Sequence, residues 1–407
     1  MFDVSQFRSH FPILNSSLDS GKKLVYVDTA STSQKPSCVI DSVCDFYRSY
    51  NANVNHGLYD FAVRATEAYE LTRSRIGKYF NVSEKEIVFT YGTTDGMNTL
   101  AASYGRKFLS AGDEVLIGAA EHHSSCLPWR RACADTGATV KIIPLRGKQY
   151  ELDVDFYRSM FGKRTKLVVI QHISNVLGNI NDIKLFTSIA HENGAKIVID
   201  GAASMAHGPL DLSDIDCDFF VTSGHKAFGP SGSGFLFGKY YLLDEMPPFR
   251  VGGRMVNEVS FADALYKLPP ERFEGGTPSI ASVIGFGESI RFLSEIDWVS
   301  ARQYLAELAK YFRDRLLEVD GIELYGSGNA GIFSFNIAPL HCHDVATILA
   351  KYGIAIRAGH HCVQPLMSLL GTSGTARISL CLYNTVEEID FIVDILKTCK
   401  SYFTRRA

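Results

Sequence analysis

The sequence predicts an α/β fold in which a mainly parallel sheet is flanked by helices, followed by a smaller α+β domain. Two observations lead to this prediction. Between residues 86 and 238, short β-branched runs alternate with amphipathic stretches of helical length, a pattern typical of βαβ units and of a sheet buried on both faces. From about residue 295, long helical patterns surround only a few strands, which indicates a separate architecture.

The strands expected in the first region are apolar and are separated by polar or glycine-containing segments. One intervening helix, "DIKLFTSIAHENG", is expected to end at Asn193-Gly194, because these residues favour a helix C-terminus. The expected strands span residues 86–90, 114–120, 139–145, 166–174, 196–200, 218–224 and 232–238.

The second region contains a helical pattern over 300–319, an apolar strand at 332–337 and a closing helix that begins at 386. No repeat or low-complexity linker interrupts the chain, so we expect its parts to pack directly against one another. These parts are an N-terminal segment on the small domain (1–25), a large domain (26–294) and a small C-terminal α+β domain (295–407).

Composition excludes several classes of function. The 407 residues are 46% apolar and 21% charged, with a net charge of −3, and no basic stripe suits nucleic acid. The start, "MFDVSQFRSHFPIL", is broken by charges and is unlike a signal peptide, and we find no apolar stretch of membrane-spanning length. Nine cysteines without a CxxC pair favour a reducing, cytoplasmic location over a disulfide framework.

Polar groups follow the predicted strands repeatedly. Ligands of open α/β sheets bind at the carboxyl ends of the strands, so these segments are candidates for one shared site. They are "GTTDG" (92–96), "EHHSS" (121–125), "SNVLG" (174–178), Asp200 and "SGHKAFGP" (223–230).

Each of these segments has an ordinary structural explanation as well as a functional one. The hydroxyls of "GTTDG" open a helix, where they could bind a phosphate or simply cap the helix. Asp200 could pair with a protonated ring nitrogen of a cofactor or cap the following turn. Lys226 could be a surface cation, but a desolvated lysine becomes an amine nucleophile that forms Schiff bases. Together, a phosphate cradle, an acid, an imidazole and such a lysine match the needs of pyridoxal 5′-phosphate.

The segment "AIRAGHHCVQPLM" (355–367) places a thiol, Cys362, between a glycine and a proline, which predicts a shaped loop. Cys362 could be a metal ligand, a nucleophile or a packed side chain. Adjacent histidines give poor ligand spacing, and no second Cys/His pair could complete a tetrahedral site. We therefore expect no metal.

These motifs together resemble those of the cysteine desulfurase/selenocysteine lyase family, whose members are fold-type I, class V aminotransferase-like pyridoxal-phosphate enzymes. The resemblance is nearest to the group II, SUF-type members and covers nearly the whole chain. It is carried by "YVDTASTSQKPSCVID" (26–41), "GTTDGMN", "EHHSS", "HISNVLG", "VIDGA", "SGHKAFGPSGSGFL", "RFEGGTPS" (272–279), "RAGHHC" and "YNT" (383–385).

The resemblance implies roles for the residues that would hold the cofactor in the large domain. Lys226 would form the Schiff base, Asp200 would hold the ring-nitrogen proton, and His122 would stack on the ring and handle protons. Thr277 would reach the phosphate bound by the other subunit, so the resemblance implies a homodimer. The remaining phosphate ligands would be Thr93, Thr94, Ser223 and His225.

It also implies roles for the residues that would handle substrate. Asn175 and Arg377 would hold the substrate carboxylate, and Arg357 would lie near the thiol loop. Cys362 would attack the sulfur of L-cysteine, giving L-alanine and a persulfide for iron–sulfur cluster assembly. The resemblance further implies L-selenocysteine as an alternative substrate and a SufE-like protein as the sulfur acceptor.

Several positions depart from the group II pattern. Ala203 stands where a glutamine usually donates to the phenolic oxygen of the cofactor. Asn55 and His56 replace the usual "HR", Tyr91 replaces an arginine, and Asp95 replaces a glutamate. These departures leave two alternatives open: a class V aminotransferase or lyase paralogue with another substrate, and a sulfur-transfer scaffold that has lost its chemistry.

Overall fold

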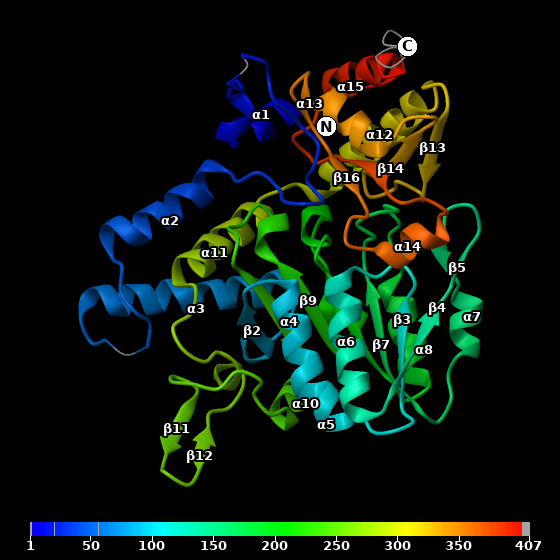
Figure 1. Ribbon diagram of the computed structural model, residues 1–407. Helices are drawn as coiled ribbons and strands as arrows, with labels where there is room; N and C mark the ends of the chain where they lie inside the picture. The colour runs from blue at the N-terminus through cyan, green and yellow to red at the C-terminus, as the bar shows by residue number, and fades with distance from the viewer. Residues whose placement is uncertain (1, 20, 56, 401–407) are drawn as a thin grey trace.

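The computed structural model describes residues 2–19, 21–55 and 57–400. It contains a large part built on a seven-stranded sheet and a smaller part built on a four-stranded sheet (Figure 1). Of the departures above, His56 lies outside the described residues. Across the described helices, none has the length and apolar character needed to cross a membrane.

The large sheet is mainly parallel, as predicted. Only β10 runs antiparallel to its two neighbours, while the other pairs are parallel. The predicted strand at 139–145 ends earlier, at Ile143, and its last residue belongs to the short β5 (Leu145–Arg146). In spatial order the strands are β2 (Ile87–Thr90), β10 (Gly234–Gly238), β9 (Phe219–Ser223), β8 (Lys196–Asp200), β7 (Thr165–Gln171), β3 (Glu114–Gly118) and β4 (Thr139–Ile143).

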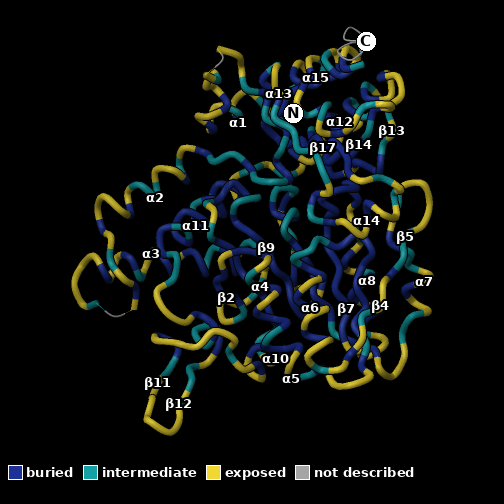
Figure 2. The backbone as a smooth tube through the Cα atoms, viewed as in Figure 1, coloured by how far each residue is buried: buried dark blue, intermediate teal, exposed yellow. Residues whose placement is uncertain are grey.

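The central strands are buried along nearly their whole length (Figure 2), and successive residues of a strand face opposite sides of the sheet. In β8, Ile197 and Ile199 join the core that includes Phe80 of α3 (Asp60–Phe80). Val198, between them, joins a second core with Trp129 of α6 (His123–Thr136). This two-sided burial explains why the strands read as continuous apolar runs in the sequence.

The small sheet is antiparallel and is covered by helices, as expected of an α+β architecture. Its strands lie in the order β13 (Ile322–Tyr325), β14 (Ile332–Ile337), β17 (Thr375–Ser379) and β16 (Arg357–Gly359). The sequence predicted β14 with these bounds. The helix predicted at 300–319 lies within three residues of α12 at both ends, and the closing helix begins at residue 386, as predicted. The helices of this part are α12 (Trp298–Leu316), α13 (Cys342–Ala350) and α15 (Val386–Thr398).

The N-terminal segment contacts both parts of the molecule. Phe11 follows α1 (Val4–Ser9). The centroid of its ring is 5.1 Å from that of Tyr383 and 5.9 Å from that of Phe292, which belongs to α11 (Ile280–Ser294). The short β1 (Val25–Tyr26) pairs with β15 (Ile354–Ala355) of the C-terminal region. The boundaries at 25 and 294 stay a prediction.

The small part packs on the large one near the carboxyl ends of the parallel strands. Leu366 and Met367 of α14 (Gln364–Leu369) form one buried cluster with Ala120, Val176 and Leu177, which follow β3 and β7. Figure 1 shows α14 above these strands. The fold therefore brings the loop that carries Cys362 to the edge where sheet ligands are expected.

Candidate active site

A cavity of about 190 Å³ lies between the strand ends of the large sheet and the small domain. It brings together residues from Ala30 to Arg377, which are 347 positions apart in the chain. Ten of the predicted site residues line it: Thr93, Thr94, His122, Asn175, Asp200, Ser223, His225, Lys226, Arg357 and Arg377.

One end of the cavity is a cluster of hydroxyl groups at the start of α4 (Thr93–Leu100). The Thr93 N–H donates to Ser223 Oγ at 2.8 Å, and the two hydroxyls lie 2.8 Å apart. Gly92 precedes them with φ of 135°, a conformation that favours glycine. A helix N-terminus with such donors favours a bound anion such as phosphate.

Asp200 ends β8 at the floor of the cavity. Its carboxylate accepts hydrogen bonds from the Ala202 N–H at 2.9 Å and from the Ser125 hydroxyl. The neighbouring Glu121 has a pKa well above its usual range because of burial and the nearby Asp200. Asp200 thus offers a buried carboxylate at the position where a ring-nitrogen proton would satisfy it.

His122 caps α6, and its Nδ1 accepts a hydrogen bond from the Ser124 N–H at 3.1 Å. Burial lowers the pKa of His122 to about 4, although Asp200 opposes the shift. The imidazole is therefore neutral near pH 7. A neutral ring on the cavity wall is suited to stacking on a planar cofactor.

Lys226 ends a short 3-10 turn, Gly224–Lys226, directly after β9. Burial lowers the pKa of its amine to about 8; Asp200 opposes this, and Arg377 and Arg357 lower it further. A lysine amine that is partly neutral near pH 7 is a competent nucleophile.

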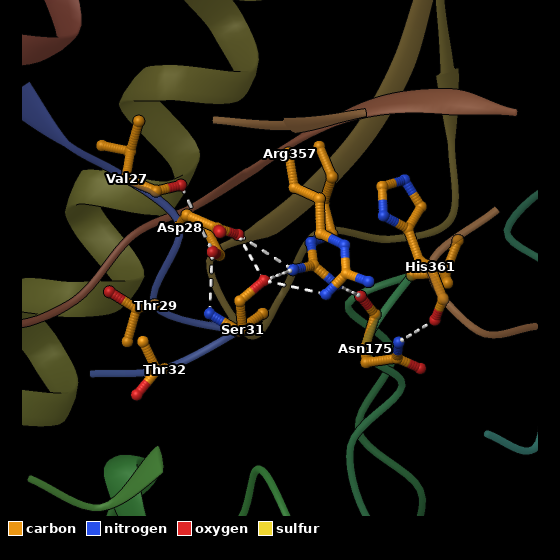
Figure 3. Close-up of polar contacts among 12 residues, drawn as sticks. Val27, Asp28, Thr29, Ser31, Thr32, Asn175, Arg357 and His361 are labelled. Atoms are coloured by element: carbon orange, nitrogen blue, oxygen red, sulfur yellow. Dashed lines mark hydrogen bonds and ion pairs between the residues drawn. The ribbon is translucent and has the colours of Figure 1, made fainter. Parts of the chain in front are cut away.

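Two guanidinium groups of the small sheet, those of Arg357 and Arg377, line the cavity; Figure 3 shows Arg357 beside Ser31 and Asn175. Arg377 donates to Asp28 Oδ1 at 3.0 Å, to Ser31 Oγ at 2.8 Å and to the Asn175 carbonyl at 3.0 Å. Arg357 donates to the same hydroxyl at 3.2 Å. Among the described residues, Arg377 Nε and Asn175 Oδ1 are buried and have no partner. These atoms leave a donor and an acceptor for a ligand.

Cys362 lies beside the cavity, in the thiol loop (residues 360–363) that joins β16 to α14. The Arg357 guanidinium approaches Cys362 Sγ at 3.9 Å. His361, its neighbour, lines the cavity and is buried, whereas Cys362 is partly exposed. Within the residues described, no three His, Cys, Asp or Glu side chains gather in a way that could hold a metal.

Thr277 lies apart from the other predicted phosphate ligands. It is exposed, it does not line the cavity, and it accepts a hydrogen bond from Asn53 Nδ2 at 3.5 Å. The phosphate role of Thr277 stays a prediction that requires a second copy of the chain.

The departures from the family pattern have structural consequences. Ala203 lines the cavity, and the neighbouring Ser204 cannot substitute for a donor there because its hydroxyl bonds His172 Nδ1 at 2.8 Å. Asp95 pairs with Arg250 at 2.7 Å, and this guanidinium also covers the Tyr91 ring. Arg250 therefore supplies a positive charge close to the position where the family has an arginine.

Three residues of the site were not singled out by their sequence. Asp28 and Ser31 hold the guanidinium pair, and Lys35 donates to the His225 carbonyl at 2.9 Å, next to Lys226. All three lie in "YVDTASTSQKPSCVID", but that stretch has no spacing that links it to residue 226 or 377. Only the tertiary contacts of these residues with His225, Arg357 and Arg377 identify them.

Residues 25–392 match the family model described as aminotransferase class-V. The chain belongs to this family. It is 45% identical over 403 residues to a probable cysteine desulfurase of Halalkalibacterium halodurans, covering 98% of this chain and 99% of that protein. A crystal structure of the Escherichia coli cysteine desulfurase CsdA is 35% identical, with a TM-score of 0.92 and 99% coverage of both chains. The apo cysteine desulfurase of Thermococcus onnurineus NA1 is 33% identical, with a TM-score of 0.90 and 98% coverage of both.

These matches confirm the predicted family and fold class. The two structures share the fold along nearly the whole chain. The departures at Ala203 and Tyr91 therefore lie within an otherwise preserved framework.

Proposed function

We propose that the chain is a cysteine desulfurase that removes sulfur from L-cysteine, releases L-alanine and leaves a persulfide on Cys362. One observation carries the proposal. Lys226 and Arg357 line one cavity, and Arg357 contacts the Cys362 thiol at 3.9 Å. A nucleophilic amine and a nucleophilic thiol thus serve the same site. Relatives that are named probable cysteine desulfurases and match nearly the full length support it.

The cavity fits pyridoxal 5′-phosphate. The hydroxyls of Thr93 and Ser223 at the start of α4 would hold the phosphate, and Asp200 would hold the ring-nitrogen proton. His122 would cover the ring, and Lys226 would hold the aldehyde carbon. When bound, the cofactor supplies an electron sink that makes the Cα proton of an amino acid acidic.

The residues of the chain then divide the remaining work. Arg377 Nε and Asn175 Oδ1 have no partner among the described residues. Arg377 Nε would donate to the substrate carboxylate, and Asn175 Oδ1, an acceptor, would take a hydrogen bond from a donor group of the substrate. Lys226, with its lowered pKa, would accept the Cα proton. The thiolate of Cys362 would attack the substrate sulfur: an S–S bond forms, the Cβ–S bond breaks, and its electron pair returns to the substrate carbon. That carbon then takes up a proton as the methyl group of alanine.

The wider setting belongs to the same proposal. The enzyme would be a group II, SUF-type homodimer with Thr277 reaching the partner subunit's phosphate site, and it would supply sulfur for iron–sulfur clusters. A SufE-like protein would accept the persulfide, which the partial exposure of Cys362 favours. L-selenocysteine would be an alternative substrate. All nine cysteines, which lie within the described residues, are free thiols, as expected in a reducing cytoplasm.

The deciding experiment compares Cys362→Ala with the native enzyme. We expect sulfide release from cysteine to fall by at least about 10³-fold, the scale seen when a nucleophile is removed, while the cofactor stays bound. Unchanged turnover would favour the paralogue with another substrate. A native preparation that binds no cofactor would favour the scaffold that has lost its chemistry.

A further inference from the structure

The backbone at Cys362 adopts an unfavourable conformation. His361 and Cys362 have φ values of 50° and 59°, in the left-handed region that residues other than glycine rarely occupy. Two such residues in succession persist only where surrounding contacts enforce them. The contacts that hold the thiol loop therefore decide where the thiol lies.

Some of these contacts come from the small domain itself. The Cys362 N–H donates to His360 Nδ1 at 3.1 Å, and His361 Nε2 lies 3.0 Å from the Thr375 carbonyl oxygen. They shape the loop, but they do not fix its distance from the strand ends of the large domain, because both partners belong to the small domain.

Val363 packs in the buried cluster with Ala120, Val176 and Leu177 of the large domain, and among the described residues the hydrogen bonds that cross to the large domain come from two residues. Asn175 Nδ2 donates to the His361 carbonyl at 3.0 Å (Figure 3), and Asn175 already has a proposed role at the substrate carboxylate. The second residue is His123, which has no proposed role. Its backbone N–H donates to the Cys362 carbonyl at 2.9 Å, and its Nε2 accepts from the Gln364 N–H at 3.3 Å.

His123 thus binds the chain at Cys362 itself and at the second residue after it, through a donor and an acceptor. It is also the residue next to His122, which faces the cavity. The start of α6 therefore links the wall of the cofactor site to the thiol loop across a single peptide unit.

We propose that His123 is a positioning residue: its neutral imidazole, by accepting the Gln364 N–H, holds the thiol loop at the cavity so that Cys362 Sγ can reach the substrate sulfur. An imidazolium has no free lone pair and could not make this contact. Burial lowers the pKa of His123, and His360 and Arg130 lower it further, which keeps the ring neutral near pH 7. The catalytic part of this inference rests on the proposed function.

The test uses the holoenzyme with His123→Ala, which removes the acceptor, and His123→Gln, whose amide oxygen can replace it. Both variants keep the backbone N–H, and alanine is compatible with a helix start. Leu127→Ala, an exposed position on the same helix, is the matched control. The first measurement is the rate of iodoacetamide alkylation at Cys362, followed on the Cys362 peptide by mass spectrometry.

We expect His123→Ala to raise the alkylation rate about fivefold, the factor that one net hydrogen bond supplies. In single-turnover experiments, persulfide formation from cysteine should fall by a similar factor with KM unchanged. His123→Gln should restore both values, and Leu127→Ala should match the native enzyme.

The proposal is overturned if His123→Ala alkylates at the native rate, if His123→Gln behaves like His123→Ala, or if KM rises while kcat stays constant. A native enzyme that forms no persulfide would instead refute the proposed function. In that case the alkylation comparison still decides whether His123 holds the loop.

Discussion

The two halves of the candidate active site are built in different ways. The floor of the cavity consists of strand ends: Asp200 lies in register with Gln171 of β7 and Val221 of β9. The thiol loop is an irregular segment with two residues at positive φ. It reaches the cavity through contacts with Asn175 and His123. The sheet fixes the first half, and docking between domains fixes the second.

This difference matches the work that each half would do. A cofactor must be held rigidly, and side chains on sheet strands are held by the backbone ladder and by packing on both faces. A sulfur carrier must meet both the substrate inside and an acceptor outside. Cys362 is partly exposed and borders the cavity through Arg357, so a loop serves this purpose better than a strand.

The largest expected effect separates the two halves by function. Lys226→Ala should lower the turnover rate by at least about 10³-fold. It should also change the visible absorption of the bound cofactor. Cys362→Ala should lose turnover to a similar extent with that absorption unchanged. Absorption spectra and sulfide assays of the two variants test this. A Cys362→Ala protein with an altered cofactor spectrum would show that the halves are not separable.

A second prediction concerns the cost of burying Lys226 in the protein without cofactor. Its folded pKa of about 8 lies below the ordinary value of 10.5. Between these values the unfolded chain binds a proton that the folded chain does not, so the free energy of unfolding should rise with pH, by about 3 kcal/mol at most. Below pH 8 this stability is absent.

Lys226→Met removes that dependence. In denaturant titrations of the cofactor-free proteins, Lys226→Met should be more stable than native at pH 7.5, and its advantage should shrink toward pH 10. An advantage that stays constant over this range would contradict a buried lysine with a lowered pKa. It would also contradict the view that burying the charged amine of Lys226 at the strand ends lowers the free energy of unfolding.

The smallest expected effect concerns Ala203, which lines the cavity without offering a donor. Ala203→Gln should bind the cofactor about fivefold more tightly, as one added hydrogen bond would allow, and should shift its absorption. The alkylation rate of Cys362 should stay at the native value, because the substitution changes the cavity at the strand ends and not the thiol loop. Equilibrium dialysis and absorption spectra test the first part. Weaker binding would indicate that glutamine is too large for this cavity.

Much of the large domain could be predicted because its signal is local. The strand at 196–200 was predicted with the bounds of β8, since apolar β-branched residues between Asn193-Gly194 and Asp200 leave few alternatives. Asp200 and Lys226 could be placed at one sheet edge because parallel strands end on the same side. The thiol loop was predicted from the glycine and the proline that flank Cys362 in the sequence.

The sequence by itself determined the fold class, the family and ten residues that line one cavity. Tertiary structure alone decided that Asp28 and Ser31 hold Arg377, that Ser204 turns away toward His172, and that His123 holds the thiol loop. The physical reason is range. Periodicity and turn chemistry act over a few residues, whereas these contacts join positions from 32 to 349 residues apart, and only the packing of the two domains creates them.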